Sequence, residues 1–277
     1  MFGTARAVVG ILNVTPDSFS DGGRYLDLEA AVAHGAALAA AGAHALDVGG
    51  ESTRPGAEPV SAADEAARVV PVIEALAEMI AVPISVDTTK AEVAAAALDA
   101  GATIVNDVSG GRFDADMLPL VAEREAGLVV MHMRGEPRTM QDDPVYDDVV
   151  AEVGDFLGER VAAAVDVGVA PTAVMADPGI GFGKTATHNL RLLAALPDLR
   201  RRAGVPLLVG TSRKAFIGAT LDLPVGERDE GTLATVVWAF DRGVTAVRVH
   251  DVETAARAAR FLDVVARATQ DGIGEAA

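Results

Sequence analysis

The chain has 277 residues, of which 50% are hydrophobic and 23% are charged, as in an ordinary globular protein of one large or two small domains. Its formal net charge of −17 disfavours nucleic acids and anionic membranes as partners, because like charges repel. The absence of cysteine excludes disulfides, zinc–thiolate sites and a cysteine nucleophile.

Short apolar runs alternate with longer, Ala-rich amphipathic segments along the chain. The runs have the length of strands and are continuous enough to be buried on both faces of a sheet. They lie at 7–12, 45–48, 83–86, 103–105, 128–131, 173–175, 207–209 and 246–249. The predicted helices between them include 28–41, 62–79, 90–100, 149–167, 231–242 and 252–269.

This order of elements is typical of one fold class. Repeated strand–loop–helix units predict an α/β protein, a (β/α)8 TIM barrel formed by a single domain over residues 1–277. A doubly wound sheet is the alternative, but the sequence has no linker-like stretch that would mark a second domain. We expect residues 270–277 to form a disordered tail.

Polar side chains end several predicted strands, and in a barrel these ends carry the active site. Asp87, Asn106 and Asp177 each end one strand. They either cap the helices that follow or together form hydrogen bonds to a flat polar ligand. Met131 beside them is equally consistent with core and with a ligand wall.

Cations gather after the last two strands, at Arg213, Lys214 and Arg248, with His250 beside them. Barrels often bind phosphate there, and Arg and Lys suit phosphate oxygens. The alternative is a solvated basic patch. No zinc-binding spacing such as HExxH occurs, whereas a weakly held Mg²⁺ needs only one or two protein oxygens, and Asn13 could supply one.

The segment 173–184, AVMADPGIGFGK, joins an apolar run to a Gly-rich loop. The glycines first suggest a phosphate cradle, but the pattern is neither GxGxxG nor a Walker motif. Asp177 is then a carboxylate presented at the rim of the fold. We interpret Lys184 as a loop-stabilising or solvent-facing cation.

Eight motifs in order resemble those of the dihydropteroate synthase family, over residues 8 to about 263. They are NVTPDSFSDGG (13–23), ESTRPG (51–56), SVDT (85–88), NDVSGG (106–111), MHM (131–133), DPGIGFGK (177–184), TSRKAFIG (211–218) and RVHD (248–251). The resemblance implies a Mg²⁺-dependent transferase of folate biosynthesis. It would join 6-hydroxymethyl-7,8-dihydropterin diphosphate to 4-aminobenzoate by an SN1-like loss of diphosphate, as a homodimer that sulfonamides inhibit competitively.

The resemblance also assigns residues to each part of the site. The pterin would be held by Asp87, Asn106, Met131, Asp177, Phe182, Gly210 and Lys214. The diphosphate and Mg²⁺ would be held by Asn13, Thr53, Arg248 and His250. The aminobenzoate would contact Phe19, Arg54, Pro55, Ser212 and Lys214. The catalytic residues would be Arg248, His250, Lys214 and Asp21.

Two other functions stay open at this stage. One is a methyltransferase on the same pterin-binding barrel, which would have no use for the diphosphate and aminobenzoate groups. The other is a non-catalytic barrel that acts as a binding protein. The N-terminal segment lacks the features of a signal peptide, and no run of about 18 apolar residues occurs, so we expect a cytoplasmic protein.

Overall fold

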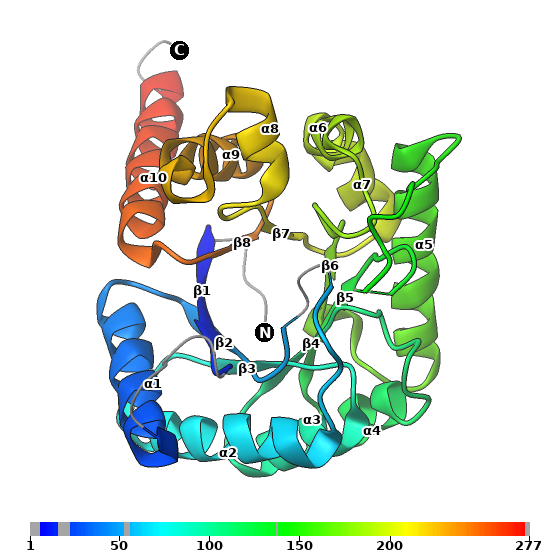
Figure 1. The fold of residues 1–277 in the computed structure, drawn as a ribbon. Coiled ribbons are helices and arrows are strands. Elements are labelled where there is room, and N and C mark those ends of the chain that lie inside the picture. Colours follow the sequence, from blue (N-terminus) through cyan, green and yellow to red (C-terminus); the bar gives the residue numbers. More distant parts are fainter. Residues whose placement is uncertain (1–5, 16–22, 53–55, 137, 275–277) are drawn as a thin grey trace.

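The computed structural model describes residues 6–15, 23–52, 56–136 and 138–274. Within these residues, parallel strands form one sheet in the order β6-β5-β4-β3-β2-β1-β8-β7, surrounded by helices (Figure 1). A bridge between Ala176 and Leu207 joins the two ends of the sheet, β6 and β7. The strand order therefore confirms the (β/α)8 barrel, and the doubly wound sheet is wrong because its sheet would stay open.

The strands begin and end within a residue or two of the predicted runs. Their bounds are β1 Ala7–Asn13, β2 Ala45–Gly49, β3 Ile84–Asp87, β4 Ile104–Asp107, β5 Gly127–Met131, β6 Val174–Asp177, β7 Leu208–Gly210 and β8 Ala246–Val249. Most strands extend one or two residues further toward the carboxyl end than predicted, because polar residues there still pair with neighbouring strands.

The helices include some that the apolar pattern did not single out. Their bounds are α1 Gly23–Ala40, α2 Ala62–Met79, α3 Ala91–Asp99, α4 Met117–Glu123, α5 Val149–Asp166, α6 Ala186–Ala194, α7 Leu196–Ala203, α8 Ala215–Leu221, α9 Asp229–Asp241 and α10 Val252–Gly274, with 3₁₀ turns η2 Pro171–Ala173 and η3 Val225–Glu227. The additional helices α4, α6, α7 and α8 are all shorter than ten residues, so they show too few turns for a periodic pattern.

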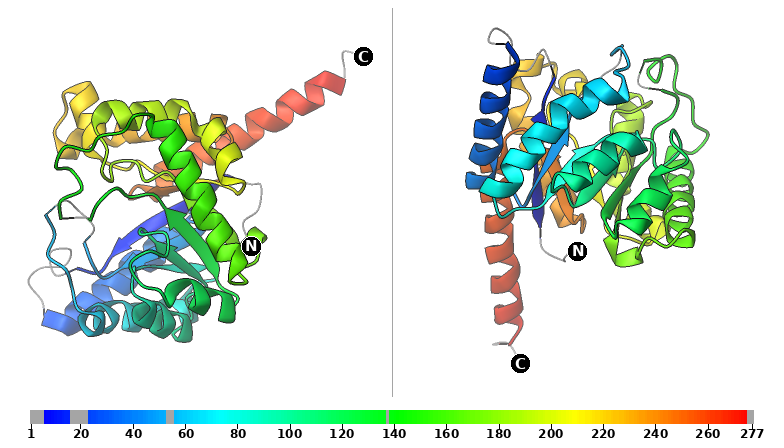
Figure 2. Two further views of the ribbon diagram at one scale, coloured as in Figure 1. Left: turned by 90° about the vertical axis from the view of Figure 1, so that its right-hand side faces the viewer. Right: turned by 90° about the horizontal axis from the view of Figure 1, so that it is seen from below.

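The C-terminal helix corrects one expectation. Residues 270–274, predicted to lie in a disordered tail, are the last residues of α10. Once a helix has formed, each further residue adds a hydrogen bond at low cost, so α10 continues past the packed part of its sequence. Figure 2 shows α10 extending well beyond the barrel. Within the described residues, no helix is both long and apolar enough to cross a membrane.

Side chains alternate between the two faces of each strand, which separates two apolar layers. Outward-facing residues such as Leu46, Val86 and Val105 pack beneath the helices in the main core. Inward-facing residues such as Val9, Ile104 and Met175 fill the amino-terminal half of the barrel. The same alternation continues to the carboxyl end of each strand, so the inward-facing positions there are available for function.

Candidate active site

Strand pairing brings the predicted strand-end residues to one end of the barrel interior. Asn13 is level with Gly49, Gly49 with Asp87, and Asp87 with Asn106. Met131 is level with Asp177, and Gly210 with Arg248. These residues fall on the same face of their strands as the inner core, two or four positions further along. The structure therefore places these strand-end residues, which the resemblance assigns to the pterin and the diphosphate, around one axis.

Arg248 links two carboxylates from different strands inside this ring. Its Nε donates to Oδ2 of Asp47 at 2.5 Å, and its Nη2 donates to Oδ2 of Asp87 at 2.9 Å. The same oxygen of Asp47 accepts from Nδ2 of Asn106 at 3.0 Å. The Asp47 carboxylate thus orients both Arg248 and Asn106, and Arg248 in turn orients Asp87.

Burial and neighbouring charges change the acidity of this network. Burial raises the pKa of Asp87 to about 7; Asp47 adds to the rise, while Arg248 opposes it. Burial lowers the pKa of Arg248, but Asp47 and Asp87 raise it by more, so the guanidinium stays charged. The site therefore contains a carboxyl group that changes charge near neutral pH.

Asp177 and Lys214 form the second polar part of the ring. Oδ1 of Asp177 accepts from the N–H of Gly179 at 2.7 Å, which fixes the carboxylate at the start of the Gly-rich loop. Nζ of Lys214 donates to the carbonyl of Ile180 in that loop and lies 4.4 Å from the centre of the Phe182 ring. Burial lowers the pKa of Lys214 to about 8, against the attraction of Asp177.

Lys184 is buried and binds the loop from inside. Its Nζ lies 2.9 Å from Nδ1 of His132 and donates to the carbonyls of His132, Gly179 and Phe182 at 3.0 to 3.3 Å. The interpretation as a loop-stabilising cation agrees with these contacts. The solvent-facing alternative is wrong, because the side chain is only 3% exposed.

The apolar wall of the site lies beside this loop. Met131 and Phe182 pack in one cluster with Val108, Met133 and Met140. A side-chain methyl added at Gly210 would lie 3.8 Å from Cβ of Arg248, in ordinary van der Waals contact, so the glycine leaves the space beside that side chain unfilled. This arrangement can receive a flat ring between a carboxylate-rich edge and an apolar wall.

Ser212 and His250 meet at the ends of β7 and β8. Oγ of Ser212 lies 2.9 Å from Nδ1 of His250 and accepts from the backbone N–H of His250 at 3.2 Å. Arg213, in contrast, binds Asp229 at the start of α9 and is exposed. The structure thus joins a predicted aminobenzoate residue to a predicted diphosphate residue, and it directs Arg213 away from them.

Five predicted residues cannot be placed in this geometry. Phe19, Asp21, Thr53, Arg54 and Pro55 lie outside the described residues, so their assignments stay predictions. Among the described residues, no group of three or more His, Cys, Asp or Glu could hold a metal ion. Asn13, half-buried at the end of β1, offers a hard amide oxygen. This fits a Mg²⁺ held mainly by water and substrate oxygens.

Sequence reasoning gave no role to Asp47, which orders the centre of the site. The available signal was a single carboxylate inside the apolar strand β2, two residues before its end. A buried carboxylate needs a partner, so it predicts a cation nearby. The identity of that cation depends on the pairing of the last strand with the first, which places β8 beside β1 and only one strand away from β2.

Comparisons with known proteins agree with this geometry. A family model described as "Pterin binding enzyme" matches residues 9–250. The chain is 48% identical over 267 residues to the dihydropteroate synthase of Synechocystis sp., covering 96% of this chain and 92% of the relative. The chain belongs to the dihydropteroate synthase family of pterin binding enzymes. It is therefore a transferase, and the family resemblance of its motifs is confirmed.

Solved structures of this family have the same fold. A dihydropteroate synthase from Xanthomonas albilineans, solved with 4-aminobenzoic acid, has a TM-score of 0.88 and 48% identity, and the match covers 94% of this chain and 93% of that one. The Yersinia pestis dihydropteroate synthase, in a sulfonamide drug complex, has a TM-score of 0.89 and 42% identity, with 95% of each chain covered.

Proposed function

We propose that this chain condenses 6-hydroxymethyl-7,8-dihydropterin diphosphate with 4-aminobenzoate to give 7,8-dihydropteroate and pyrophosphate, by an SN1-like path. The observation that carries the proposal is the convergence of the inward-facing strand ends. Carboxylates, an amide, an apolar wall and two cations come together at the carboxyl ends of the strands, and these are the groups that a pterin with a diphosphate arm requires.

The pterin end of the site follows from hydrogen-bond chemistry. A pterin has a guanidine-like N–C–N edge whose N–H groups suit a carboxylate that is already fixed in position. Asp177 is fixed by Gly179, and Asn106 by Asp47. Phe182 and Met131 cover the ring and exclude water. Lys214, which contacts the Gly-rich loop at Ile180, supplies a further hydrogen-bond donor to the pterin.

The diphosphate end stabilises a leaving group. As the bond from the methylene carbon to the diphosphate oxygen breaks, both electrons leave with the oxygen, and the pterin ring spreads the positive charge that develops on carbon. Arg248 and His250 stabilise the growing negative charge, as fixed donors do in a site with little water. The amine of aminobenzoate then attacks the carbon and loses a proton, so no covalent enzyme intermediate is needed.

Mg²⁺ belongs to the same proposal. Asn13 would hold the ion together with water and the diphosphate, and when bound the ion would neutralise charge on the leaving group. A single amide oxygen makes the ion dependent on the substrate for the rest of its ligands. We therefore expect tight Mg²⁺ binding only when a diphosphate compound is present.

The purified protein tests the proposal directly. With Mg²⁺ and both substrates, we expect one pyrophosphate for each dihydropteroate formed. The SN1-like path predicts that ¹⁸O in the bridging position of the pterin diphosphate scrambles to non-bridging positions when aminobenzoate is left out. Turnover without such scrambling would favour direct displacement by the amine, and absence of dihydropteroate would contradict the function itself.

We also propose inhibition by sulfonamides and assembly as a homodimer in the cytoplasm. A sulfonamide has an aniline like that of aminobenzoate, so inhibition should be competitive with aminobenzoate. On the outer helices, Phe261 and Val264 of α10 are 68% and 54% exposed, and a second copy of this chain would bury them. Light scattering should show a dimer that Phe261→Ser together with Val264→Ser converts to a monomer.

A further inference from the structure

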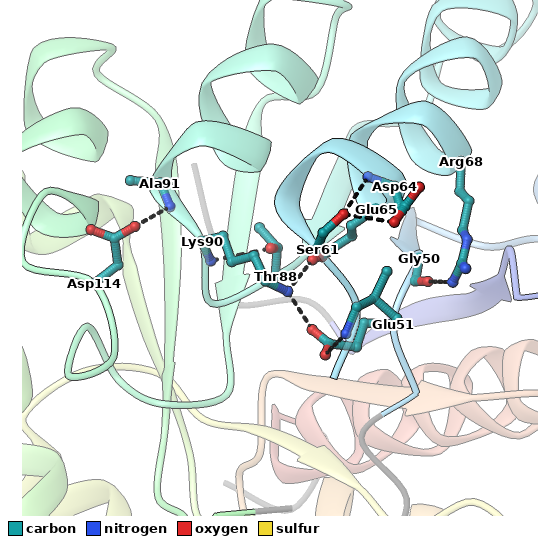
Figure 3. A network of polar contacts seen from close by, with 11 residues as sticks. Gly50, Glu51, Ser61, Asp64, Glu65, Arg68, Thr88, Lys90, Ala91 and Asp114 are labelled. Atoms are coloured by element: carbon teal, nitrogen blue, oxygen red, sulfur yellow. Dashed lines mark hydrogen bonds and ion pairs between the residues drawn. The ribbon is translucent and has the colours of Figure 1, made fainter. Parts of the chain in front are cut away.

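Two buried carboxylates in the described part of the chain each keep one oxygen without a hydrogen-bond partner, Oε1 of Glu65 and Oδ1 of Asp47. Glu65 lies on α2, where Nζ of Lys90 binds it together with Glu51 (Figure 3). Asp47 lies inside the barrel, where its Oδ2 binds Arg248 and its side chain lines a cavity. Asp47 is therefore a hydrogen-bond acceptor beside an internal cavity.

The cavity has a volume of about 240 Å³ and lies at the amino-terminal end of the strands. Three of the residues that line it, His44, Pro83 and Thr245, directly precede β2, β3 and β8. His44 and Pro83 are exposed, and the backbone N–H of Val8 donates to Nδ1 of His44 at 3.1 Å, which fixes the ring there. The cavity therefore opens at the end of the barrel opposite the candidate active site.

Small side chains on one side of the barrel leave this space open. The interior of a TIM barrel is normally filled by layers of bulky side chains. Four neighbouring strands, β8, β1, β2 and β3, here contribute small residues to the wall, with Val9 as an additional larger one: Ala246, Ala7, Ala45 and Ser85. The other strands, β4 to β7, contribute larger residues: Ile104, Val129, Met175 and Leu208. The hollow thus follows from the residue sizes at these inward-facing positions.

The cavity has a polar side at β2 and β3. Ser85 is only 4% exposed, and within the described residues no hydrogen bond engages its Oγ. Asp47, on the neighbouring strand, is level with Ser85. A serine hydroxyl can accept a hydrogen bond, and a carboxylate oxygen can only accept. Because buried polar atoms without partners cost free energy, a ligand that brings a hydrogen-bond donor to this side is favoured.

We propose that this cavity is a second binding site, for a small, mostly apolar molecule with one N–H or O–H group that donates to Oγ of Ser85. An apolar cavity of about 150 Å³ can hold benzene, so this larger one has room for a two-ring molecule such as indole. The apolar body packs against Val129, Met175 and Leu208. The inference goes beyond the proposed function and does not depend on it, because binding here requires neither a pterin nor a diphosphate.

Indole and benzothiophene are a matched pair of probes for the hydrogen bond. They have similar size and shape, but only indole carries an N–H. In calorimetric titrations of the full chain, Ser85→Ala should raise the Kd of indole by roughly 3- to 10-fold, because one hydrogen bond is lost. The Kd of benzothiophene should stay within about twofold of the wild-type value, since it makes no such bond. Equal changes for the two probes would overturn the role of Ser85.

Methionine methyl groups report where indole binds. Met175 lines the cavity, whereas Met133 and Met140 pack in the apolar wall of the candidate active site. In protein labelled with ¹³C at its methionine methyl groups, indole should shift the Met175 signal and leave those of Met133 and Met140 in place. Shifts at Met133 and Met140 without one at Met175 would place indole at the active-site wall. No shift at the solubility limit of indole would leave the cavity to water. Either result overturns the inference.

Filling the cavity should prevent binding. Ala45→Leu and Ala246→Leu each place a larger side chain in its wall, so each should raise the Kd of indole by at least about tenfold, since a packed interior does not yield to extra volume at low cost. Ala194→Leu, on the exposed surface of α6, is the matched control and should bind indole as the wild type does. Thermal unfolding identifies a variant that does not fold, and the other then provides the test. Unchanged indole binding in a folded variant with the cavity filled would overturn the inference.

Discussion

Nη2 of Arg248 lies 2.9 Å from Oδ2 of Asp87, although the two residues are 161 positions apart in the sequence. The pair spans the barrel from β8 to β3, and Asp47 of β2 shares the same guanidinium. A residue assigned to the diphosphate is therefore bound to a residue assigned to the pterin. The two halves of the proposed site are electrostatically coupled.

Replacing Arg248 should affect both stability and activity. Arg248→Met leaves Asp47 and Asp87 buried without their cation, so we expect the free energy of unfolding to fall by about 3–5 kcal/mol. The rate of pyrophosphate release should fall by at least about 100-fold, since a fixed donor to the leaving group is lost. Urea unfolding and a pyrophosphate assay measure the two effects.

The matched control for that variant is Arg257→Met. Arg257 pairs with Glu253 on the exposed surface of α10, where ion pairs contribute little. We expect its unfolding free energy to change by less than about 0.5 kcal/mol, with full activity. If Arg248→Met and Arg257→Met changed the unfolding free energy and the activity equally, the buried Arg248 network would contribute no more than an exposed ion pair.

The raised pKa of Asp87 predicts a pH dependence of stability. In the folded state its pKa is about 7, above the value of about 3.9 in an unfolded chain. Between these values the folded state holds more protons, so this group makes the protein less stable as pH rises from 4 to 7 and adds no further change above 7. Asp87→Asn removes the contribution. Its stability relative to wild type should therefore increase by on the order of 1 kcal/mol for each pH unit in that window. A constant difference across the window would contradict the raised pKa.

His132 predicts a pH dependence of the opposite sign. Burial, aided by the charge of Lys184, lowers its pKa to about 2, below the value of about 6.5 for an unfolded chain. Below pH 6.5 the unfolded state binds a proton that the folded state does not, so stability is lost as pH falls. By pH 5 this loss should reach about 2 kcal/mol, and His132→Gln should not show it. If the imidazole were accessible to solvent, denaturant titrations at pH 7 and pH 5 would show the same loss of unfolding free energy in the wild type and in His132→Gln.

Gly179 should tolerate no side chain. Its φ is 63°, and an added Cβ would lie 1.9 Å from the carbonyl oxygen of His132. We expect Gly179→Ala to lower the free energy of unfolding by about 3 kcal/mol or more, and to weaken pterin binding because Gly179 fixes Asp177. Calorimetric titration with the pterin measures the second effect.

Gly204 provides the control for the clash. Its φ of 71° is similar, but an added Cβ would meet no atom within 4 Å. Gly204→Ala should therefore cost only the left-handed backbone strain, about 1 kcal/mol, and leave pterin binding unchanged. If both alanine variants lost the same stability, backbone strain alone would explain the effect at Gly179.

The sequence by itself determined the order of the elements and the ends of the strands. Continuous apolar runs predicted buried parallel strands, because such runs can be recognised from local composition alone. The polar residue after each run then marked the functional end of the strand. Asp87, Asn106 and Asp177 were found in this way, and Arg248 was found as one of the cations gathered at the last two strands. The family motifs then supplied their roles, which spacing alone did not determine.

Only the tertiary structure decided which of these groups touch. Asp47 and Glu65 are single carboxylates in apolar surroundings, and their partners, Arg248 and Lys90, lie on other strands and connections. The burial of Lys184 likewise depends on His132, the residue after β5, lying against the Gly-rich loop. Such contacts arise from the closure of the barrel and the register of its strands. They join residues far apart in the chain, so no local pattern in the sequence could predict them.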